Sequence, residues 1–353
     1  HGAEFWAAVL DPVTFEVVHL FNFTCGGTSC SFQRGDITDI PTQNLFIVTA
    51  DTAATYFINP ENYSFQVHSL SPDTGPTAYD PVASTLLFSN ESSPSEVVSA
   101  HLTGFYPLRG SISGASYPVR GLVSADYYSV GGFFVLTGVD VTSGRLEVEA
   151  VNLTAAPFAS YTESASLGAG EPESTVIWSA SGVESTLVAS DGTNQSIRLT
   201  LYSSAPYFSY ANSYPMYPTG LWGIGVDSSR GIVIEGSDYP LALRAFYASN
   251  STLAWTVFLS NRSYAEDLVV DSTLGTVYVS QEPFLPIEIF SADTGVQVGS
   301  VPTLYGASQI YLDPVRGELF VVGNSDVSNV SAYSLTATGG TFLGTYSTSF
   351  TSN

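Results

Sequence analysis

The sequence predicts an all-β protein: a seven-bladed β-propeller of four-stranded blades with an additional N-terminal β-hairpin. Two observations support this prediction. A short apolar run, commonly ending in Asp, is followed by a turn and a second apolar run, and this pair recurs about every 41 to 55 residues. Two further strand-like runs with period-2 alternation follow each pair, and no segment keeps an apolar period of 3.6 residues. Four short strands per unit are typical of a propeller blade.

The repeat divides the chain into an N-terminal segment, residues 1–30, and a propeller over residues 31–353. The fourth unit is degenerate, whereas the last three are clear. In the sixth unit, runs 287–290 and 296–301 flank a turn and supply the outer strands. The paired runs are, in chain order, 37–39 with 45–48, 78–80 with 86–88, 123–126 with 133–136, 176–179 with 186–188, 224–227 with 232–234, 269–271 with 277–279, and 311–313 with 319–322.

The segment Tyr311–Asn324 resembles the YVTN-type (WD40/YVTN-like) β-propeller repeat. It contains an apolar strand that ends in Asp313-Pro314, a tight turn, and a second strand that ends in Asn324. Most other copies have Ser, Ala or Gly where the family has this Asn. The resemblance implies a propeller fold on a secreted or cell-surface protein, and it implies little about activity.

The N-terminal segment resembles the outer two strands of a blade. Runs 5–10 and 14–20 flank the turn Asp11-Pro12-Val13, but the last unit already has its own outer pair near 330–335 and 341–346. The hairpin then either packs on the ring or extends a blade, or it is donated to a neighbouring molecule, since exposed strand edges template pairing. Trp6 and Phe15 are its candidate interface residues.

Composition excludes several classes of protein. The chain has 353 residues with 32 Asp or Glu and only 9 basic residues, all Arg, for a net charge of −23. So few cations cannot neutralise a run of phosphates, so nucleic-acid binding is excluded. Hydrophobic residues make up 44%, which is enough for a core and argues against disorder. No apolar stretch is long enough for a transmembrane segment.

Eight of the asparagines stand in Asn-x-Ser/Thr sequons, none with Pro in the middle. Chance would give about three at this Ser/Thr content. An exported, N-glycosylated surface is the favoured interpretation, and composition bias is the alternative. Because the chain starts at His1-Gly2, we expect a mature chain whose signal peptide has been removed. The sequons are at Asn22, Asn62, Asn90, Asn152, Asn194, Asn250, Asn261 and Asn329.

Cys25 and Cys30 flank a Gly-Gly turn and are the only cysteines. A zinc site would need further ligands, and no histidine lies nearby at ligand spacing. A small disulfide loop is therefore expected if the compartment is oxidising.

No constellation of residues predicts catalysis, a metal or a cofactor. The histidines, His1, His19, His68 and His101, lie in different units without metal-site spacing, and no nucleophile elbow or P-loop is present. The repeated acids invite a calcium or catalytic interpretation, but their place before a turn favours capping of backbone amides. These acids are Asp39, Asp80, Asp126, Asp227, Asp271 and Asp313.

Tyrosines and prolines alternate between residues 206 and 218, which is unusual. Tyrosine combines an apolar face with a polar tip and is common at interfaces. Packing between blades is one interpretation, and contact with a partner or glycan is the other. The candidate interface residues are Tyr207, Tyr210, Tyr214 and Tyr217.

Together these features predict an extracellular, N-glycosylated propeller that is not an enzyme and needs no cofactor. We expect a structural or adhesive building block of a cell-surface layer or filament, which associates with itself or with other surface glycoproteins, with β-strand donation as one route of assembly. Two alternatives remain open: a sugar- or lactone-directed hydrolase or lyase acting at a central channel, and a non-catalytic glycan- or ligand-binding ectodomain.

Overall fold

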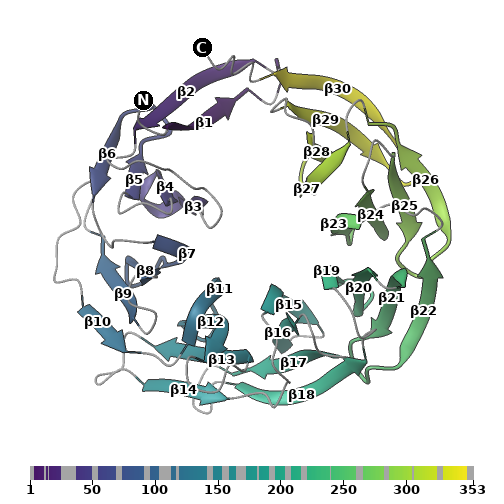
Figure 1. Cartoon of the computed structure of the whole chain (residues 1–353), viewed down its shortest axis with the longest axis horizontal. Helices are drawn as coiled ribbons and strands as arrows, with labels where there is room; N and C mark the ends of the chain where they lie inside the picture. Colours follow the sequence, from purple (N-terminus) through teal and green to yellow (C-terminus); the bar gives the residue numbers. More distant parts are fainter. Residues whose placement is uncertain are drawn as a thin grey trace. The chain divides into compact units, whose positions relative to one another are not determined.

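The computed structural model describes most of the chain and confirms that it is all-β (Figure 1). Between Pro41 and Gln43 lies a 3-10 helix, the only helical element within the described ranges. The described residues are 4–11, 13–14, 16–24, 37–49, 55–68, 74–90, 96–102, 113–116, 119–140, 146–152, 159–163, 172–180, 183–190, 195–202, 208–215, 221–238, 240–259, 265–281, 286–303, 306–323 and 329–347.

Each predicted repeat corresponds to one antiparallel meander of four strands. The meanders are β3 (Ile37–Ile40), β4 (Leu45–Thr49), β5 (Thr55–Ile58), β6 (Phe65–His68); β7 (Thr74–Asp80), β8 (Thr85–Asn90), β9 (Glu96–His101), β10 (Ser113–Ser116); β11 (Val119–Tyr128), β12 (Phe133–Asp140), β13 (Leu146–Asn152), β14 (Ala159–Glu163); β15 (Pro172–Ala180), β16 (Val183–Ser190), β17 (Gln195–Leu201), β18 (Phe208–Pro215); β19 (Leu221–Asp227), β20 (Ile232–Asp238), β21 (Leu241–Tyr247), β22 (Leu253–Phe258); β23 (Ala265–Asp271), β24 (Thr276–Gln281), β25 (Ile287–Ser291), β26 (Gln297–Val301); and β27 (Ala307–Asp313), β28 (Glu318–Gly323), β29 (Asn329–Thr336), β30 (Gly339–Ser347).

The last two meanders join into one eight-stranded sheet, because β26 and β30 form a single parallel pair, Ser300 with Gly339. Gly299 permits this approach, since any side chain there would meet the backbone of Thr338. The N-terminal strands β1 (Glu4–Leu10) and β2 (Val17–Thr24) form a separate two-stranded sheet.

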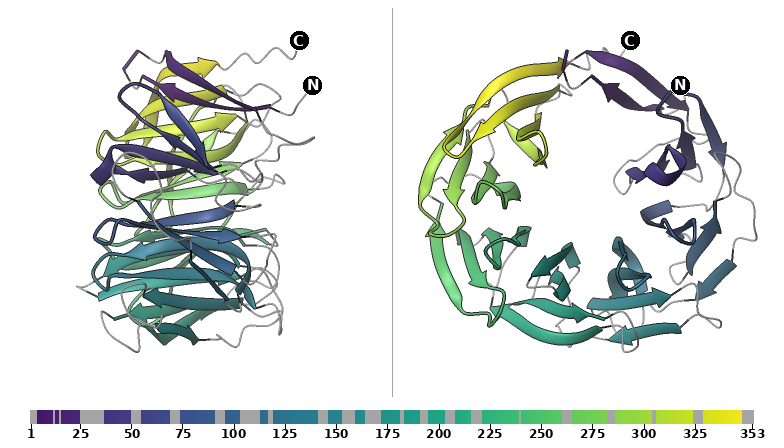
Figure 2. Two further views of the ribbon diagram at one scale, coloured as in Figure 1. Left: turned by 90° about the vertical axis from the view of Figure 1, so that its left-hand side faces the viewer. Right: turned by 180° about the vertical axis from the view of Figure 1, so that it is seen from behind.

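The chain divides into two compact units. The first comprises His1–Val9, His19–Pro172 and Leu201–Tyr210, and the second comprises Leu10–Val18, Glu173–Thr200 and Ala211–Asn353. Within the second unit, the first strands of successive sheets, β19, β23 and β27, lie side by side (Figures 1 and 2). Within the first unit, β7 likewise lies between β3 and β11.

The core lies between the faces of successive sheets. In the second unit, Ile234 and Leu243 of one sheet pack against Val277 and Val279 of the next. In the first unit, Ile47 and Phe57 pack with Tyr79 and Leu86 in the same way. In β24, Val277 and Val279 pack against one neighbouring sheet and Tyr278 packs against the next. Every residue of this strand is therefore buried, because successive side chains point to opposite faces and both faces are covered.

A four-residue turn joins the first strand to the second in six meanders. The strand-end residue pairs with the residue five positions later, and the fourth turn residue has positive φ, as in Asp271, Thr276 and Gly275 (φ 67°). The strand-end Asp fixes this turn by accepting two backbone N–H groups. Asp271 Oδ1, for example, accepts from Thr273 N at 2.8 Å and Leu274 N at 3.0 Å.

The structural interpretation of the repeated acids holds for Asp80, Asp227, Asp271 and Asp313, each of which binds the second and third amides after it. Asp11 forms the same contacts in the β1–β2 turn, to Val13 N at 2.7 Å and Thr14 N at 2.9 Å. The backbone hydrogen bond from Thr14, and after it the one from Val13, lower the pKa of Asp11.

Two acids of this series were aligned incorrectly. Ile40 and Tyr128 occupy the strand-end position of their turns, because they pair with Leu45 and Phe133. Asp39 lies one residue earlier, exposed on β3, and Asp126 lies two residues earlier, where it accepts from Ser124 Oγ at 2.9 Å. Matching acids by type placed them one and two positions too early, because the turn is defined by backbone register.

Removing a strand-end carboxylate is expected to destabilise the fold. Asp271→Ala removes the buried carboxylate that accepts from two turn amides and should lower the free energy of unfolding by about 1 to 3 kcal/mol, the loss of two hydrogen bonds, in denaturant titrations. Asp271→Asn keeps an acceptor oxygen and should lose less. Asp39→Ala, at an exposed position outside the turn, should change the free energy of unfolding by less than about 0.5 kcal/mol. Equal losses for Asp39→Ala and Asp271→Ala would contradict the role of the strand-end carboxylate in the turn.

Candidate functional site

Two predicted glycan acceptors lie in equivalent hairpin turns. Asn62 lies between β5 and β6, and Asn250 lies between β21 and β22. In the first turn Asn59 N donates to Ser64 O at 2.9 Å, and in the second Tyr247 N donates to Thr252 O, also at 2.9 Å. In both, the middle residue of the sequon has positive φ, 58° at Tyr63 and 57° at Ser251.

The sequon side chains form the same hydrogen bonds in both turns. Asn62 Oδ1 accepts from Ser64 N at 3.0 Å and Ser64 Oγ at 2.7 Å. Asn250 Oδ1 accepts from Thr252 N at 3.0 Å and Thr252 Oγ1 at 2.7 Å. Both asparagines are exposed. The amide oxygen is therefore held by the turn, and the amide nitrogen, the atom that N-glycosylation would modify, is left for solvent.

Asn329 differs from these two acceptors. It starts β29 and is only 4% exposed, so a sugar could not be attached to it without displacing its neighbours. Asn152, the last residue of β13, is half-buried. For Asn22 in β2 and Asn90 at the end of β8 the structure describes the backbone only. Asn194 and Asn261 lie outside the described residues.

Several other predicted site residues also lie beyond what the structure describes. Cys25 and Cys30 are outside the described residues, so the disulfide remains a prediction. Phe15, Tyr207 and Tyr217 lie outside as well. The structure places the backbones of Trp6 in β1 and of Tyr210 and Tyr214 in β18, without describing their side chains.

Of the four histidines, the structure describes the side chain of His19 alone. His19 stacks on Tyr63 with ring centroids 4.7 Å apart and meets Phe21 edge-on. The backbones of His68 and His101 belong to β6 and β9, and His1 lies outside the described residues. Among the described residues no three His, Cys, Asp or Glu side chains cluster as metal ligands do.

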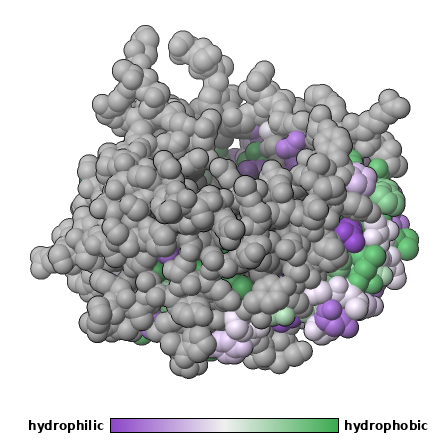
Figure 3. All heavy atoms as spheres, turned by 60° about the horizontal axis from the view of Figure 1, so that its bottom comes forward, coloured by the Kyte–Doolittle hydropathy of each residue, from purple (hydrophilic) through white to green (hydrophobic). Residues whose placement is uncertain are grey.

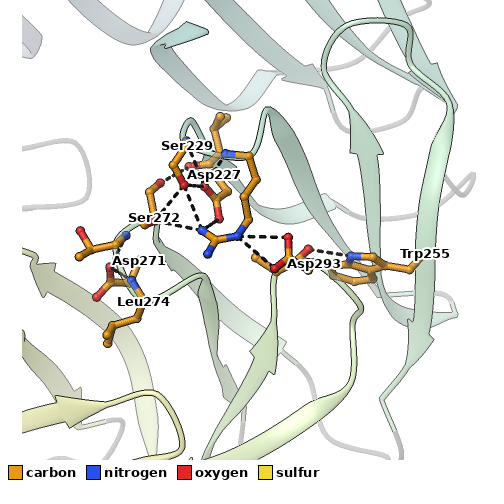
Figure 4. Close-up of polar contacts among 11 residues, drawn as sticks. Asp227, Ser229, Trp255, Asp271, Ser272, Leu274 and Asp293 are labelled. Carbon is orange, nitrogen blue, oxygen red and sulfur yellow. Dashed lines mark hydrogen bonds and ion pairs between the residues drawn. The ribbon is translucent and has the colours of Figure 1, made fainter. Parts of the chain in front are cut away.

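Arg230 connects two successive sheets of the second unit, and Figure 4 labels its partners Asp227, Ser272 and Asp293. From the β19–β20 turn its guanidinium bonds Asp227 Oδ2 at 2.9 Å and Ser272 O at 3.0 Å, and it pairs with Asp293 of the β25–β26 turn at 3.1 Å. The Asp227 side chain is fully buried. A fork of N–H donors suits this role, because it can bind two carboxylates and a carbonyl at once.

Trp255 forms a second connection between the same two sheets (Figure 4). Its Nε1 donates to Ala292 O at 2.8 Å across to the β25–β26 turn. A side chain on Gly295 would lie 2.7 Å from the indole, so the ring packs directly on this glycine. At the positive-φ position of its turn, the β25–β26 hairpin therefore has Gly295, whereas the two sequon turns have Tyr63 and Ser251.

Burial raises the pKa of two carboxylates of the second unit, Glu235 and Asp267. Glu235 of β20 lies opposite Arg244 of β21, and burial raises the pKa of Glu235 although Arg244 opposes this. Asp267 lies at a bulge in β23, where its carboxylate accepts from Ile310 N of the next sheet at 3.0 Å and from Leu268 N at 2.8 Å. Burial raises the pKa of Asp267, and these two amides partly offset the rise.

Sequence reasoning identified four of the capping acids but missed the contacts between sheets. Arg230 had a usable signal, because it stands three residues after a strand-end Asp, as Arg316 does after Asp313. Neither its partner Asp293 nor the pairing of Asp267 with Ile310 has any local signal.

Comparison with known proteins shows the fold alone. The sequence matches no family model and no curated protein. Solved structures that are similar include BamB from Moraxella catarrhalis (TM-score 0.62, 9% identity, 88% of this chain and 86% of that chain) and the Cps50 (Swd1) β-propeller domain of Myceliophteria thermophila (0.58, 12%, 87% and 99%). A chain of the mitotic checkpoint complex is also similar (0.54, 13%, 76% and 78%).

The chain therefore has a β-propeller fold, as the repeat predicted. The finer resemblance to the YVTN-type family stays a prediction. Among the described residues, no helix has the length and apolar character needed to cross a membrane.

Losing the guanidinium of Arg230 is expected to destabilise the protein. Arg230→Ala removes the cationic partner of the buried Asp227 carboxylate, which keeps only the neutral donors of its own turn, and should lower the free energy of unfolding by about 2 to 3 kcal/mol. Arg316→Ala is the matched control, since Arg316 pairs with Asp313 at 3.5 Å with its side chain 54% exposed, and should cost less than about 1 kcal/mol. Equal losses in urea titrations would contradict the role of Arg230 between the sheets.

Glu235 is expected to make stability fall as pH rises. Well below its ordinary pKa of 4.5 the carboxyl is protonated in both states and contributes nothing. Above it the unfolded chain ionises first, because burial raises the pKa in the folded state. Glu235→Gln should therefore lose less stability than the parent protein between pH 4 and 7 (about the range in which carboxyls titrate). Parallel stability–pH curves for the two proteins would contradict this.

Proposed function

We propose that this chain is an exported, N-glycosylated β-propeller that acts as a non-catalytic building block of a cell-surface or extracellular assembly. The observation on which this proposal depends is the pair of exposed sequon turns at Asn62 and Asn250, whose side chains have the same hydrogen bonds and the same exposure. Equivalent acceptors in two sheets far apart in the chain favour a glycosylated surface over chance composition.

We further propose seven blades with one extra hairpin. Seven four-stranded meanders follow one another from β3 to β30, and β1 with β2 stands apart as its own sheet. Phe21 of β2 packs with Val48, Tyr56 and Ile58 of β4 and β5. The hairpin therefore packs on a blade of its own chain without entering its ladder, which favours this arrangement over donation to a neighbour.

Exposed apolar side chains support a role in contacts with other molecules. Val82 and Val315, in the equivalent turns after Asp80 and Asp313, are 87% and 93% exposed. Figure 3 shows further apolar side chains at the surface, on the side where Figure 1 draws β22 and β26. A similar propeller chain occurs in the mitotic checkpoint complex, and propellers without a catalytic centre commonly present such surfaces to partners.

Glycans are expected at Asn62 and Asn250 and absent at Asn329 in native material. Peptides should be prepared with chymotrypsin, because the chain has no lysine. Mass spectrometry should find sugar on both exposed acceptors, and expression of Asn62→Gln and Asn250→Gln should each remove one glycan from the intact mass. Unmodified Asn62 and Asn250 would overturn the proposal of a glycosylated surface.

The same native preparation tests the building-block proposal. Negative-stain images should show filaments, sheets or higher oligomers. A strictly monodisperse monomer at all concentrations, with its glycans attached, would overturn this part of the proposal while leaving the glycosylation intact.

A further inference from the structure

The turn that presents Asn250 also presents an aromatic ring beside it. Tyr247, three residues before the acceptor, donates from its backbone N to Thr252 O, so the two residues are cross-strand neighbours. Cross-strand neighbours point their side chains to the same face of a hairpin. Thr252 Oγ1 in turn donates to Asn250 Oδ1 at 2.7 Å. The Asn250 amide is therefore held on the face of the hairpin that Tyr247 occupies.

The surroundings of Tyr247 leave its ring available. The residue is 46% exposed, although its neighbour Phe246 is fully buried. Nearly half of Tyr247 therefore stays in solvent at the end of β21, three residues from the asparagine whose amide nitrogen the proposed sugar would modify. A pyranose ring has one face of C–H groups, which can stack on an aromatic ring and cover it from water.

We propose that Tyr247 packs against the first sugar of the N-glycan on Asn250 and so anchors that glycan to the outer hairpin of its sheet. This rests on the proposed glycosylation of the chain and adds a positioning residue to it. Tyr247 should then contribute more to the stability of the glycosylated protein than to that of the unmodified one.

The hairpin between β5 and β6 provides a matched control within the same molecule. Its backbone hydrogen bonds, positive φ and sequon contacts reproduce those of the Asn250 turn, but Asn59 replaces Tyr247 at the equivalent position. Asn59 Oδ1 accepts from Glu61 N at 2.8 Å and offers no apolar face. A glycan on Asn62 therefore has no ring at this position to pack on.

The test is a double-mutant cycle in a secretory host that attaches N-glycans. Tyr247→Ala, Asn250→Gln and the double variant are compared with the parent protein by unfolding in guanidinium. In the parent protein, the glycan should lower the unfolding equilibrium constant about threefold to tenfold relative to Asn250→Gln. In Tyr247→Ala, the glycan should lower this constant by less than about twofold relative to the double variant. Trimming the glycan enzymatically to its first sugar should preserve the effect. The same cycle in a host without N-glycosylation should give no coupling.

The Asn62 turn supplies the complementary experiment. Asn62→Gln should change the unfolding constant by less than about twofold, and Asn59→Tyr should create a glycan-dependent stabilisation there. Peptide mass spectrometry distinguishes the two ways in which the proposal can fail. A glycan on Asn250 with no coupling to Tyr247 overturns the contact alone. An Asn250 that is never modified overturns the contact together with the proposed glycosylation of this site.

Discussion

The described hairpins depend on one backbone constraint, the left-handed conformation of the fourth residue in each four-residue turn. All described residues with positive φ occupy this position: Asn44, Tyr63, Ser84, Gly132, Gly231, Ser251, Gly275, Gly295 and Gly317. Across each of these four-residue turns, the strand-end residue pairs with the residue five positions later. A slip of one residue would exchange the two faces of a strand, so this turn fixes which side chains enter the core.

Polar groups connect the sheets at the points where apolar packing alone would leave backbone groups without partners. Asp267 accepts the N–H of Ile310 from the adjacent first strand, and Trp255 donates to the carbonyl of Ala292. These contacts are directional, unlike the packing of Ile234 on Val277, and they fix how far one sheet is displaced along the next. Arg230 fits this pattern, since it lies within a contact between sheets.

The fold could be predicted because its signals are local. A strand-end Asp such as Asp271, the turn after it and the alternation on either side all lie within about a dozen residues of one another. The strand-end position itself was harder to assign where Ile40 and Tyr128 replace Asp, since backbone register and not residue type defines it. Contacts between sheets, such as Arg230 with Asp293, join residues 63 apart, and no local pattern indicates them. The burial of Asn329 likewise depends on neighbours distant in sequence.

The approach of β30 to β26 has a consequence for how this surface meets other chains. The single parallel pair of Ser300 with Gly339 lies on the outermost strand of a sheet, the place where unpaired backbone groups invite aggregation. With Thr338 against Gly299, that stretch of edge is already occupied by the chain's own hairpin. Growth of a fibril by edge-to-edge pairing is blocked there. A larger residue at position 299 would push the hairpin away and reopen the edge to strands of other molecules.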